Sequence, residues 1–178
     1  MELEIGQKVA YPNQGVCLIE DIEKKTFGEN SVTCYALRVL SDNSTILVPM
    51  ANAENVGIRP LLSSIQCKKL IKRLSADFDD VSGDWKTRSR EFTDKLRSGD
   101  VFEAADVLKK LTFLSHEKKL SFREQTLLEK SKFLILSEIS NADTADVEIL
   151  RGEIDRLVAS ACKKHEVADP EVFSQAVH

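Results

Sequence analysis

The sequence predicts an α+β protein in which a small antiparallel β-barrel is followed by an all-α domain of about five helices. Short β-rich runs separated by turn-forming residues fill the first sixty residues, which also hold four of the seven glycines and three of the four prolines. From residue 63 onward the apolar residues recur at the spacing of an amphipathic helix. This change of period divides the chain into two folding units.

The N-terminal unit is predicted to contain four strands, which cover residues 8–11, 16–19, 32–40 and 45–50. Turn-forming sequences separate them at residues 12–15, 28–30 and 41–44. Short strands joined by tight turns pair in antiparallel order, so we expect them to curl into a barrel around one small core.

The boundary between the two units is predicted just after Pro60, which ends the last extended segment. Ser63 or Ser64 can then cap the first helix. We assign residues 1–62 to the barrel, residues 63–164 to the helical domain and residues 165–178, where the helical period is lost, to a flexible tail. Because the linker is short, we expect a restricted but not fixed mutual orientation and a small polar interface.

Two amphipathic segments predict the first two helices. Cys67, Leu70 and Leu74 belong to an apolar stripe at helical spacing, which gives the first helix one buried face. The second helix is predicted to begin after its N-cap Asp84 and to end at Gly99 in the C-cap position.

The other three helices are predicted from their N-caps. Asp100 is expected to cap the third helix and to form a capping box with Glu103. Ser121 and Glu124 form a more typical capping box at the start of the fourth helix, and Thr144 is expected to cap the fifth.

Composition excludes several classes of protein. The chain has 178 residues, a formal net charge of −4 and 42% hydrophobic residues, and it has no apolar run long enough to span a bilayer. Its first six residues lack the basic and apolar regions of a secretory signal. We therefore expect a cytoplasmic protein, without membrane contacts.

Enzymatic and metal-binding motifs are absent from the sequence. It contains no Gly-rich phosphate loop, no Gly-x-Ser-x-Gly and no His-Glu-x-x-His. The cysteines form no Cys-x-x-Cys pair, so we expect neither a metal site nor a cofactor. Cys17, Cys34 and Cys67 are instead predicted to be small buried hydrophobic residues. The sequence favours a binding protein over an enzyme.

The histidines and the acidic loop are predicted to have no chemical role. His116 is expected to be solvated near the end of the third helix, and His165 and His178 to lie in the frayed C-terminal segment. The carboxylates of residues 77–80 are expected to form a solvated turn rather than a metal site.

The segment 85–97 is the most informative for function, because five basic and two acidic residues give it a net charge of +3 in an acidic chain. It begins with Trp85, the only tryptophan. Trp85 can be a core anchor on the same face as Phe92. Alternatively, it is an exposed aromatic residue among basic side chains, as in proteins that enter a distorted minor groove and unstack a base step. The pattern leaves both interpretations open.

The outer face of the first helix is also basic, since Lys68, Lys69, Lys72 and Arg73 all point away from its apolar stripe. This face either extends a footprint on DNA phosphates or is an ordinary solvated helix face.

Several segments resemble one family. Residues 5–16, 46–49 and 52–59 resemble the N-terminal RNA-polymerase-interaction module of CarD-like transcription regulators, a module that also occurs in transcription-repair coupling factors. Residues 85–88, 96–101 and 119–124 resemble the C-terminal half of the same family. The similarity runs in the right order from about residue 3 to residue 163, which makes it specific.

The resemblance implies a fold, two partners and two sets of contacts. It implies that a Tudor-like barrel binds the β subunit of bacterial RNA polymerase. It also implies that Trp85 inserts into the minor groove of promoter DNA at the upstream edge of the bubble. This insertion would stabilise the open complex. The implied DNA-contacting residues are Trp85, Lys86, Arg88, Arg90, Lys68 and Lys72. The implied polymerase contacts are Lys25, Thr45, Leu47 and Pro49. Position 47 is basic in some relatives, so Leu47 is a departure from the family.

We therefore expect a monomer that binds RNA polymerase and promoter DNA, with contacts to phosphates and the minor groove but no sequence-specific readout. The alternative is a protein-interaction adaptor without DNA contact, in which Trp85 lies in the core. Phosphate contacts make DNA binding steeply salt-dependent, which separates the two hypotheses.

Overall fold

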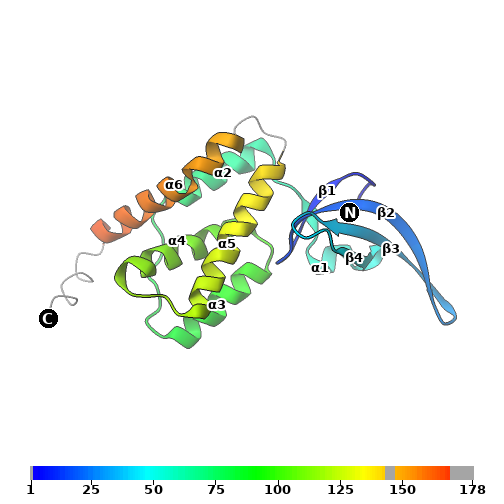
Figure 1. The fold of residues 1–178 in the computed structure, drawn as a ribbon, viewed down its shortest axis with the longest axis horizontal. Helices are drawn as coiled ribbons and strands as arrows, with labels where there is room; N and C mark the ends of the chain where they lie inside the picture. The colour runs from blue at the N-terminus through cyan, green and yellow to red at the C-terminus, as the bar shows by residue number, and fades with distance from the viewer. Residues whose placement is uncertain (1, 143–146, 169–178) are drawn as a thin grey trace.

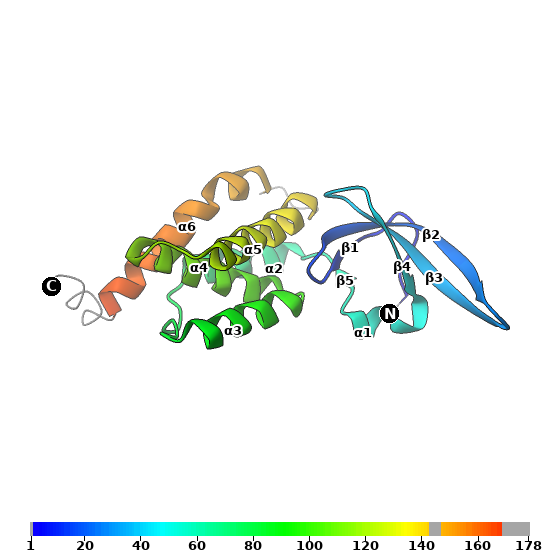
Figure 2. The ribbon, with the colours of Figure 1, turned by 60° about the horizontal axis from the view of Figure 1, so that its bottom comes forward.

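The computed structural model describes residues 2–142 and 147–168. The molecule is elongated, with a β-sheet at one end and a bundle of helices at the other (Figures 1 and 2). This arrangement confirms the predicted α+β class, with the sheet N-terminal to the helices.

Five antiparallel strands form the sheet in the order β4-β3-β2-β1-β5. Their bounds are β1 Lys8–Tyr11, β2 Gly15–Phe27, β3 Asn30–Val39, β4 Thr45–Pro49 and β5 Arg59–Pro60. Strand β4 lies at one edge of the hydrogen-bonded sheet and β5 at the other. A short helical connection, η1 (Met50–Asn52) and α1 (Ala53–Val56), joins these two edges and was not predicted.

The β2–β3 hairpin is longer than predicted, because β2 continues from Ile19 to Phe27. The pairing with β3 shifts register between Ile19 and Asp21, which marks a β-bulge. Beyond the bulge most side chains of β2 are exposed on both faces, so the apolar alternation that identifies a strand is missing there. The hairpin projects as a two-stranded ribbon (Figure 2).

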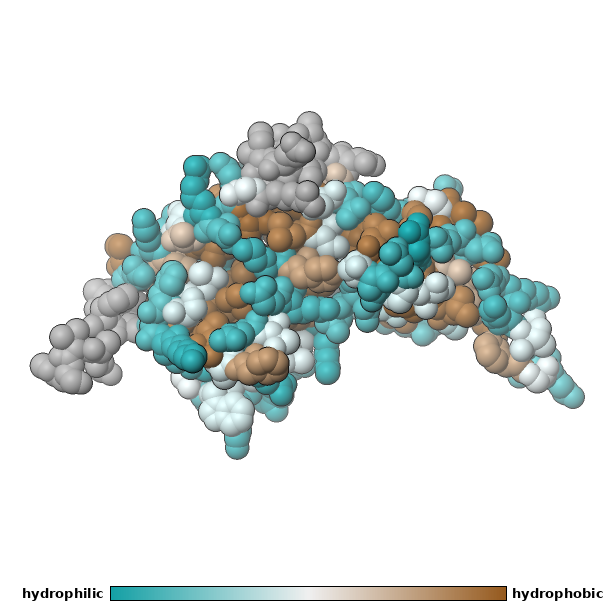
Figure 3. Space-filling model, in the orientation of Figure 1, coloured by the Kyte–Doolittle hydropathy of each residue, from teal (hydrophilic) through white to brown (hydrophobic). Residues whose placement is uncertain are grey.

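The sheet forms its own core, as predicted, but its edge strands β4 and β5 do not pair with each other to close a barrel within the described residues. Fully buried side chains on three neighbouring strands contribute most of the core, namely Val9, Cys17, Ile19, Tyr35, Leu37 and Val39. Burial of each large aliphatic side chain contributes about 1.5–3 kcal/mol, so this small core is sufficient to organise the sheet. In the view of Figure 3, hydrophobic surface gathers on the sheet and in the seams between helices, while hydrophilic side chains cover most of the helices.

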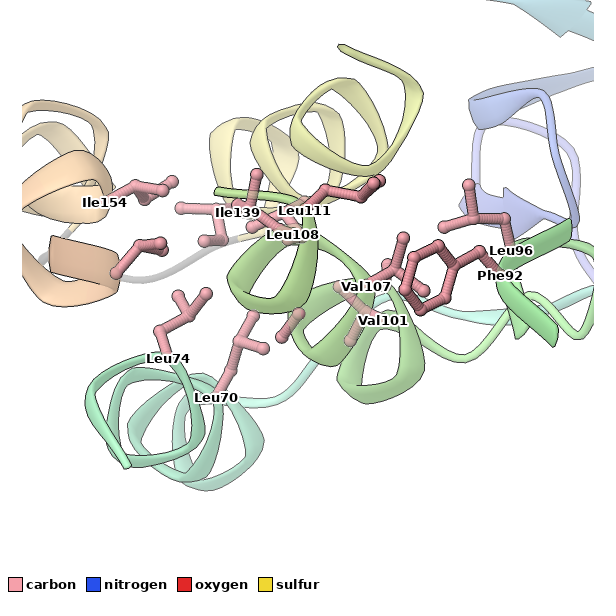
Figure 4. Close-up of a cluster of buried hydrophobic side chains, with 14 of the residues drawn as sticks. Leu70, Leu74, Phe92, Leu96, Val101, Val107, Leu108, Leu111, Ile139 and Ile154 are labelled. Carbon is pink, nitrogen blue, oxygen red and sulfur yellow. The ribbon is translucent and has the colours of Figure 1, made fainter. Parts of the chain in front are cut away.

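Five helices follow the sheet, as predicted: α2 (Ser64–Ser75), α3 (Trp85–Arg97), α4 (Val101–Glu117), α5 (Phe122–Asn141) and α6 (Val147–Ala168). Helix α4 packs against each of the other four. Figure 4 shows Val107, Leu108 and Leu111 of α4 among apolar side chains of its neighbours. No helix within residues 2–142 and 147–168 combines the length and the apolarity needed to cross a bilayer.

Most of the predicted helix caps are confirmed. Ser63 and Ser121 each form a capping box, the latter with Glu124. The box predicted between Asp100 and Glu103 is wrong, because Asp100 accepts the Phe102 N–H at 2.8 Å and Glu103 instead pairs with a lysine of α3. Helix α3 ends at a different residue from the one predicted, since Ser98 is its C-cap and Gly99 follows with φ +77°. The predicted cap Thr144 lies outside the described residues.

Helix α6 continues to Ala168, so the helix ends later than residue 164. The physical reason is His165, which is 7% exposed rather than frayed. Its ring stacks on Phe78 with centroids 4.2 Å apart, and its Nδ1 lies 2.9 Å from the Asp77 carboxylate. The 77–80 loop is thus partly fixed against α6. The other histidine within the described residues, His116, is exposed as predicted. His178 and the rest of the predicted tail lie outside the described residues.

The sheet and the helices meet through polar contacts. Arg59 of β5 donates two hydrogen bonds to the Glu138 carboxylate of α5, at 2.5 and 2.8 Å, and two more to the carbonyl of Gly99. The Val16 N–H donates to Ser137 Oγ at 3.2 Å. These contacts place the end of α5 against the first hairpin of the sheet.

Candidate nucleic-acid interface

Trp85 is an exposed residue in the first turn of α3. The Asp84 carboxylate accepts the Thr87 N–H at 3.0 Å and starts the helix immediately before Trp85. Phe92 and Leu96 lie on the same face of the helix, about two and three turns further along, and are buried, whereas Trp85 itself is 62% exposed. The interpretation of Trp85 as a core anchor is therefore wrong.

Two of the predicted basic residues accompany the indole. Lys86 and Arg90 are exposed, and Lys86 Nζ lies 5.7 Å from the centroid of the Trp85 ring. Arg90 and Arg97 line a shallow groove together with Trp85. This side of α3 presents one large aromatic surface among cationic groups, a combination that suits a polyanion with stacked bases.

Arg88 is not part of this exposed surface. It is only 3% exposed, and it donates to the Ser82 carbonyl at 2.5 Å and to Glu124 of α5 at 2.7 Å. The expectation that Arg88 contacts a phosphate is wrong, because its charge is already neutralised in the interior. Arg88 is a neighbour of Trp85 on the helix surface, but it lies one turn further along α3, where Glu124 of α5 covers it.

Glu124 completes this anchor. Burial alone would raise the pKa of its carboxyl group, but hydrogen bonds from the Ser121 N–H, from Arg88 and from the Ser121 hydroxyl lower it to about 2. Glu124 is therefore ionised at neutral pH and fixes the start of α5 against α3. Glu124 therefore has two roles: it belongs to the capping box of α5, and it forms an ion pair with Arg88 of α3.

The basic face of α2 does not join Trp85. Lys68 and Lys72 are exposed, but α2 packs on α4 and α6, whereas α3 packs on α4 and α5. Figure 4 shows α4 between α2 and α3. The two groups of predicted DNA-contacting residues thus lie on separate parts of the helical domain.

The structure instead brings a different set of basic residues to Trp85. Lys118, Lys119 and Arg123, at the turn between α4 and α5, line a groove that Trp85 also lines. All three are exposed. The residues flanking the Ser121 capping box are visibly basic in the sequence, but only the packing of α5 on α3 shows that they lie beside the tryptophan.

The four predicted polymerase contacts lie on the sheet. Thr45, Leu47 and Pro49 alternate along the edge strand β4 and are exposed, and Leu47 is 44% exposed. Lys25 lies on the projecting part of β2, where its ammonium is 2.5 Å from the Glu23 carboxylate. Phe27, at the end of the same ribbon, is 66% exposed and was not predicted as a contact.

The cysteines of the described residues are buried, as predicted for three of them. Cys17, Cys34, Cys67 and Cys162 are all buried, and burial raises the pKa of Cys17 to about 11, so this thiol is protonated at neutral pH. Across the part of the chain that the structure describes, no group of three or more His, Cys, Asp or Glu side chains is placed to hold a metal ion.

The fold and these two surfaces define a two-domain binding protein, with an edge-strand surface on the sheet and a basic aromatic surface on the helices. Two family models match the sequence: the CarD-like/TRCF RID domain over residues 3–62 and the CarD C-terminal domain over residues 69–155. The chain belongs to the CarD-like family of transcription regulators, which interact with RNA polymerase.

Two known proteins are similar to the chain. The chain is 27% identical over 157 residues to YdeB of Bacillus subtilis (strain 168), a candidate transcription factor, and the match covers 88% of this chain and 97% of YdeB. The solution NMR structure of the 72-residue N-terminal domain of Myxococcus xanthus CarD is 32% identical, with a TM-score of 0.29, over 33% of this chain and 79% of that chain.

Proposed function

We propose that this protein binds the β subunit of bacterial RNA polymerase through the edge of its sheet and stabilises the open promoter complex through Trp85. In this account the indole enters the minor groove at the upstream edge of the bubble, and Lys86, Arg90 and the basic residues of the α4–α5 turn contact phosphates. The protein reads no base sequence.

The observation that carries the proposal is the exposure of Trp85 among basic side chains. A large aromatic residue in the first turn of a helix, 62% exposed, contributes little to the fold and is available to a partner. Its cationic neighbours favour an anionic partner such as DNA over an apolar or basic protein surface.

The mechanism follows from differential affinity. An indole can insert only where a base step is unstacked, so it binds melted DNA better than closed duplex. A ligand shifts an equilibrium only by the difference between its affinities for the two states, and phosphate contacts alone bind both states alike. Trp85 therefore supplies the preference for the open complex. Lys86 and Arg90 hold the helical domain in place on the DNA backbone through their phosphate contacts.

The sheet supplies the attachment to polymerase. Strand β4 is an edge strand of the sheet, and an edge strand can pair with an extended segment of a partner. The exposed Leu47 adds an apolar contact at a position that is basic in some relatives. Attachment to polymerase raises the local concentration of the helical domain at the promoter, which offsets weak intrinsic DNA affinity.

Site-specific photo-crosslinking tests the proposal. A photoreactive side chain at Lys86 should crosslink to promoter DNA at the upstream edge of the bubble when the full chain, polymerase and promoter are combined. The same group at Ile65, which is 69% exposed on α2, should give much less product. Equal yields at both positions, or crosslinks to protein alone, would favour an adaptor without DNA contact. Dependence of the Lys86 product on salt would add support, since adaptor binding lacks counterion release.

A further inference from the structure

We propose that the groove beside Trp85 binds one nucleotide of the DNA strand that Trp85 unstacks, with the base in the groove and the phosphate on its rim. This inference rests on the proposed function, because it requires Trp85 to enter DNA. It adds a second contact for the displaced strand, separate from the indole.

The groove lies between the first turn of α3 and the α4–α5 turn, and its volume is about 520 Å³. Trp85 and Leu120 supply its apolar lining, and Leu120 is 8% exposed. The exposed Lys118, Lys119 and Arg123 contribute positive charge to the same lining. A nucleotide has the matching composition, with a flat base that stacks on apolar groups and an anionic phosphate.

Two buried polar groups of this groove have no hydrogen-bond partner within the described residues. They are the Ser89 hydroxyl and the Arg88 Nε–H, on side chains that are 9% and 3% exposed. Buried polar groups without partners are unfavourable and infrequent in native proteins. The edge of a base can both donate and accept hydrogen bonds, so a base in the groove supplies the kind of partner that these groups lack.

The charges in the groove place the base and the phosphate in different positions. Glu124 lies in the lining, where its carboxylate pairs with Arg88 at 2.7 Å and lies 3.6 Å from Lys118. A phosphate beside that carboxylate would be repelled, whereas a neutral base would not. The phosphate therefore belongs beside Lys119 and Arg123, which lie in the exposed part of the turn.

Trp85, Ser89 and Arg123 also line a second, smaller groove, to which Lys86, Arg90 and Arg97 contribute. A strand that crosses the indole meets cationic side chains on both sides of it. The base that loses its stacking partner to the indole can therefore turn into the groove without moving its neighbouring phosphates away from positive charge.

A double-mutant cycle, which combines a substitution in the protein with an abasic nucleotide in the DNA, tests the inference. The experiment measures the lifetime of open complexes formed by polymerase, promoter and the full chain, either wild type or Ser89→Leu, which fills the groove. Each is tested on an intact promoter and on promoters with a single abasic nucleotide at successive positions around the upstream edge of the bubble. We expect Ser89→Leu to shorten the lifetime about fivefold on the intact promoter. At one abasic position the wild-type lifetime should fall by a similar factor, and Ser89→Leu should add no further loss.

Several outcomes would overturn the inference. One is a Ser89→Leu effect of equal size on every template, and another is no effect on any template. A loss of polymerase affinity without dependence on abasic position would assign the groove to a polymerase segment instead. If Ser89→Leu lowers the melting temperature of the protein, Ser89→Ala replaces it in the same cycle, with an expected effect of about twofold.

Trp85→Ala distinguishes a failure of the proposed function from a failure of the groove assignment. If it leaves the lifetime unchanged, the proposed function fails, and if it shortens the lifetime while the cycle is additive, only the groove assignment fails.

Discussion

Arg88 donates a hydrogen bond to the Glu124 carboxylate across 2.7 Å and so joins α3 to α5 in the interior of the helical domain. The two residues are 3% and 8% exposed, whereas Trp85, three positions before Arg88, is 62% exposed. One short stretch of helix therefore carries an internal anchor and an external aromatic contact. The anchor fixes the position from which the indole projects.

Arg88→Ala should therefore act on stability. Removal of Arg88 takes away the nearest cation from the buried Glu124 carboxylate and leaves it only Lys118 at 3.6 Å, so we expect a loss of about 3 kcal/mol in the free energy of unfolding. Arg90→Ala, at an exposed position of the same helix, should change it by less than about 0.5 kcal/mol. Urea melts of both variants measure this difference. If Arg88→Ala melted like Arg90→Ala, the assignment of Arg88 as an anchor would be wrong.

Acid should weaken the same contact. The pKa of Glu124 is about 2 in the folded protein, against an ordinary value of 4.5. Because the folded-state pKa is the lower one, ionised Glu124 stabilises the fold fully above about pH 4.5, and this stabilisation is lost as the pH falls through about 2. The shift corresponds to about 3 kcal/mol.

Unfolding free energies of wild type and Glu124→Gln between pH 2 and pH 7 test this expectation. The two curves should lie apart at pH 7 and converge toward pH 2. Parallel curves would show that Glu124 has the same pKa in both states.

Much of the architecture could be predicted because it depends on local signals. The apolar stripe of α2, the caps Asp84 and Ser121, and the turns of the sheet all lie within a few residues of the structure they specify. The long β2–β3 ribbon could not be predicted, since its side chains are exposed on both faces and carry no periodic apolar signal.

The candidate site was harder to predict because its members depend on packing between helices. The sequence shows that Trp85 and Arg88 are near each other, but not that one projects outward while the other pairs with Glu124. Likewise, Lys119 and Arg123 lie more than thirty residues from Trp85 and reach it only through the fold.

The interface between sheet and helices should depend on Arg59. Arg59→Ala removes both hydrogen bonds to Glu138, a residue that is only 4% exposed, so we expect a loss of about 2 kcal/mol in stability. We also expect a wider range of orientations between the domains, visible as an increased radius of gyration in small-angle X-ray scattering. The double variant Arg59→Glu with Glu138→Arg should recover part of both losses. An unchanged scattering profile for Arg59→Ala would show that other contacts hold the two domains together.

The sheet alone should bind polymerase. Residues 1–62 contain the complete core of the sheet and the edge strand β4, so this fragment should fold by circular dichroism and retain bacterial RNA polymerase. In the full chain, Leu47→Asp should weaken binding at least about tenfold without lowering stability, because Leu47 is exposed on that strand. Ile5→Asp, at an exposed position before β1, is the matched control. A folded fragment that failed to bind, while residues 63–178 succeeded, would reverse the assignment of the domains.

The most direct test of the account compares the stability and the activity of Trp85→Ala. Since Trp85 is exposed, the variant should lose less than about 1 kcal/mol in a urea melt. In a decay assay with polymerase and promoter, its open complexes should nevertheless be markedly shorter-lived than those formed with wild type, because unstacked DNA has lost its partner. An unchanged lifetime, or a shortened lifetime fully explained by a loss of about 3–5 kcal/mol in stability, would contradict the role of Trp85 as a wedge in DNA.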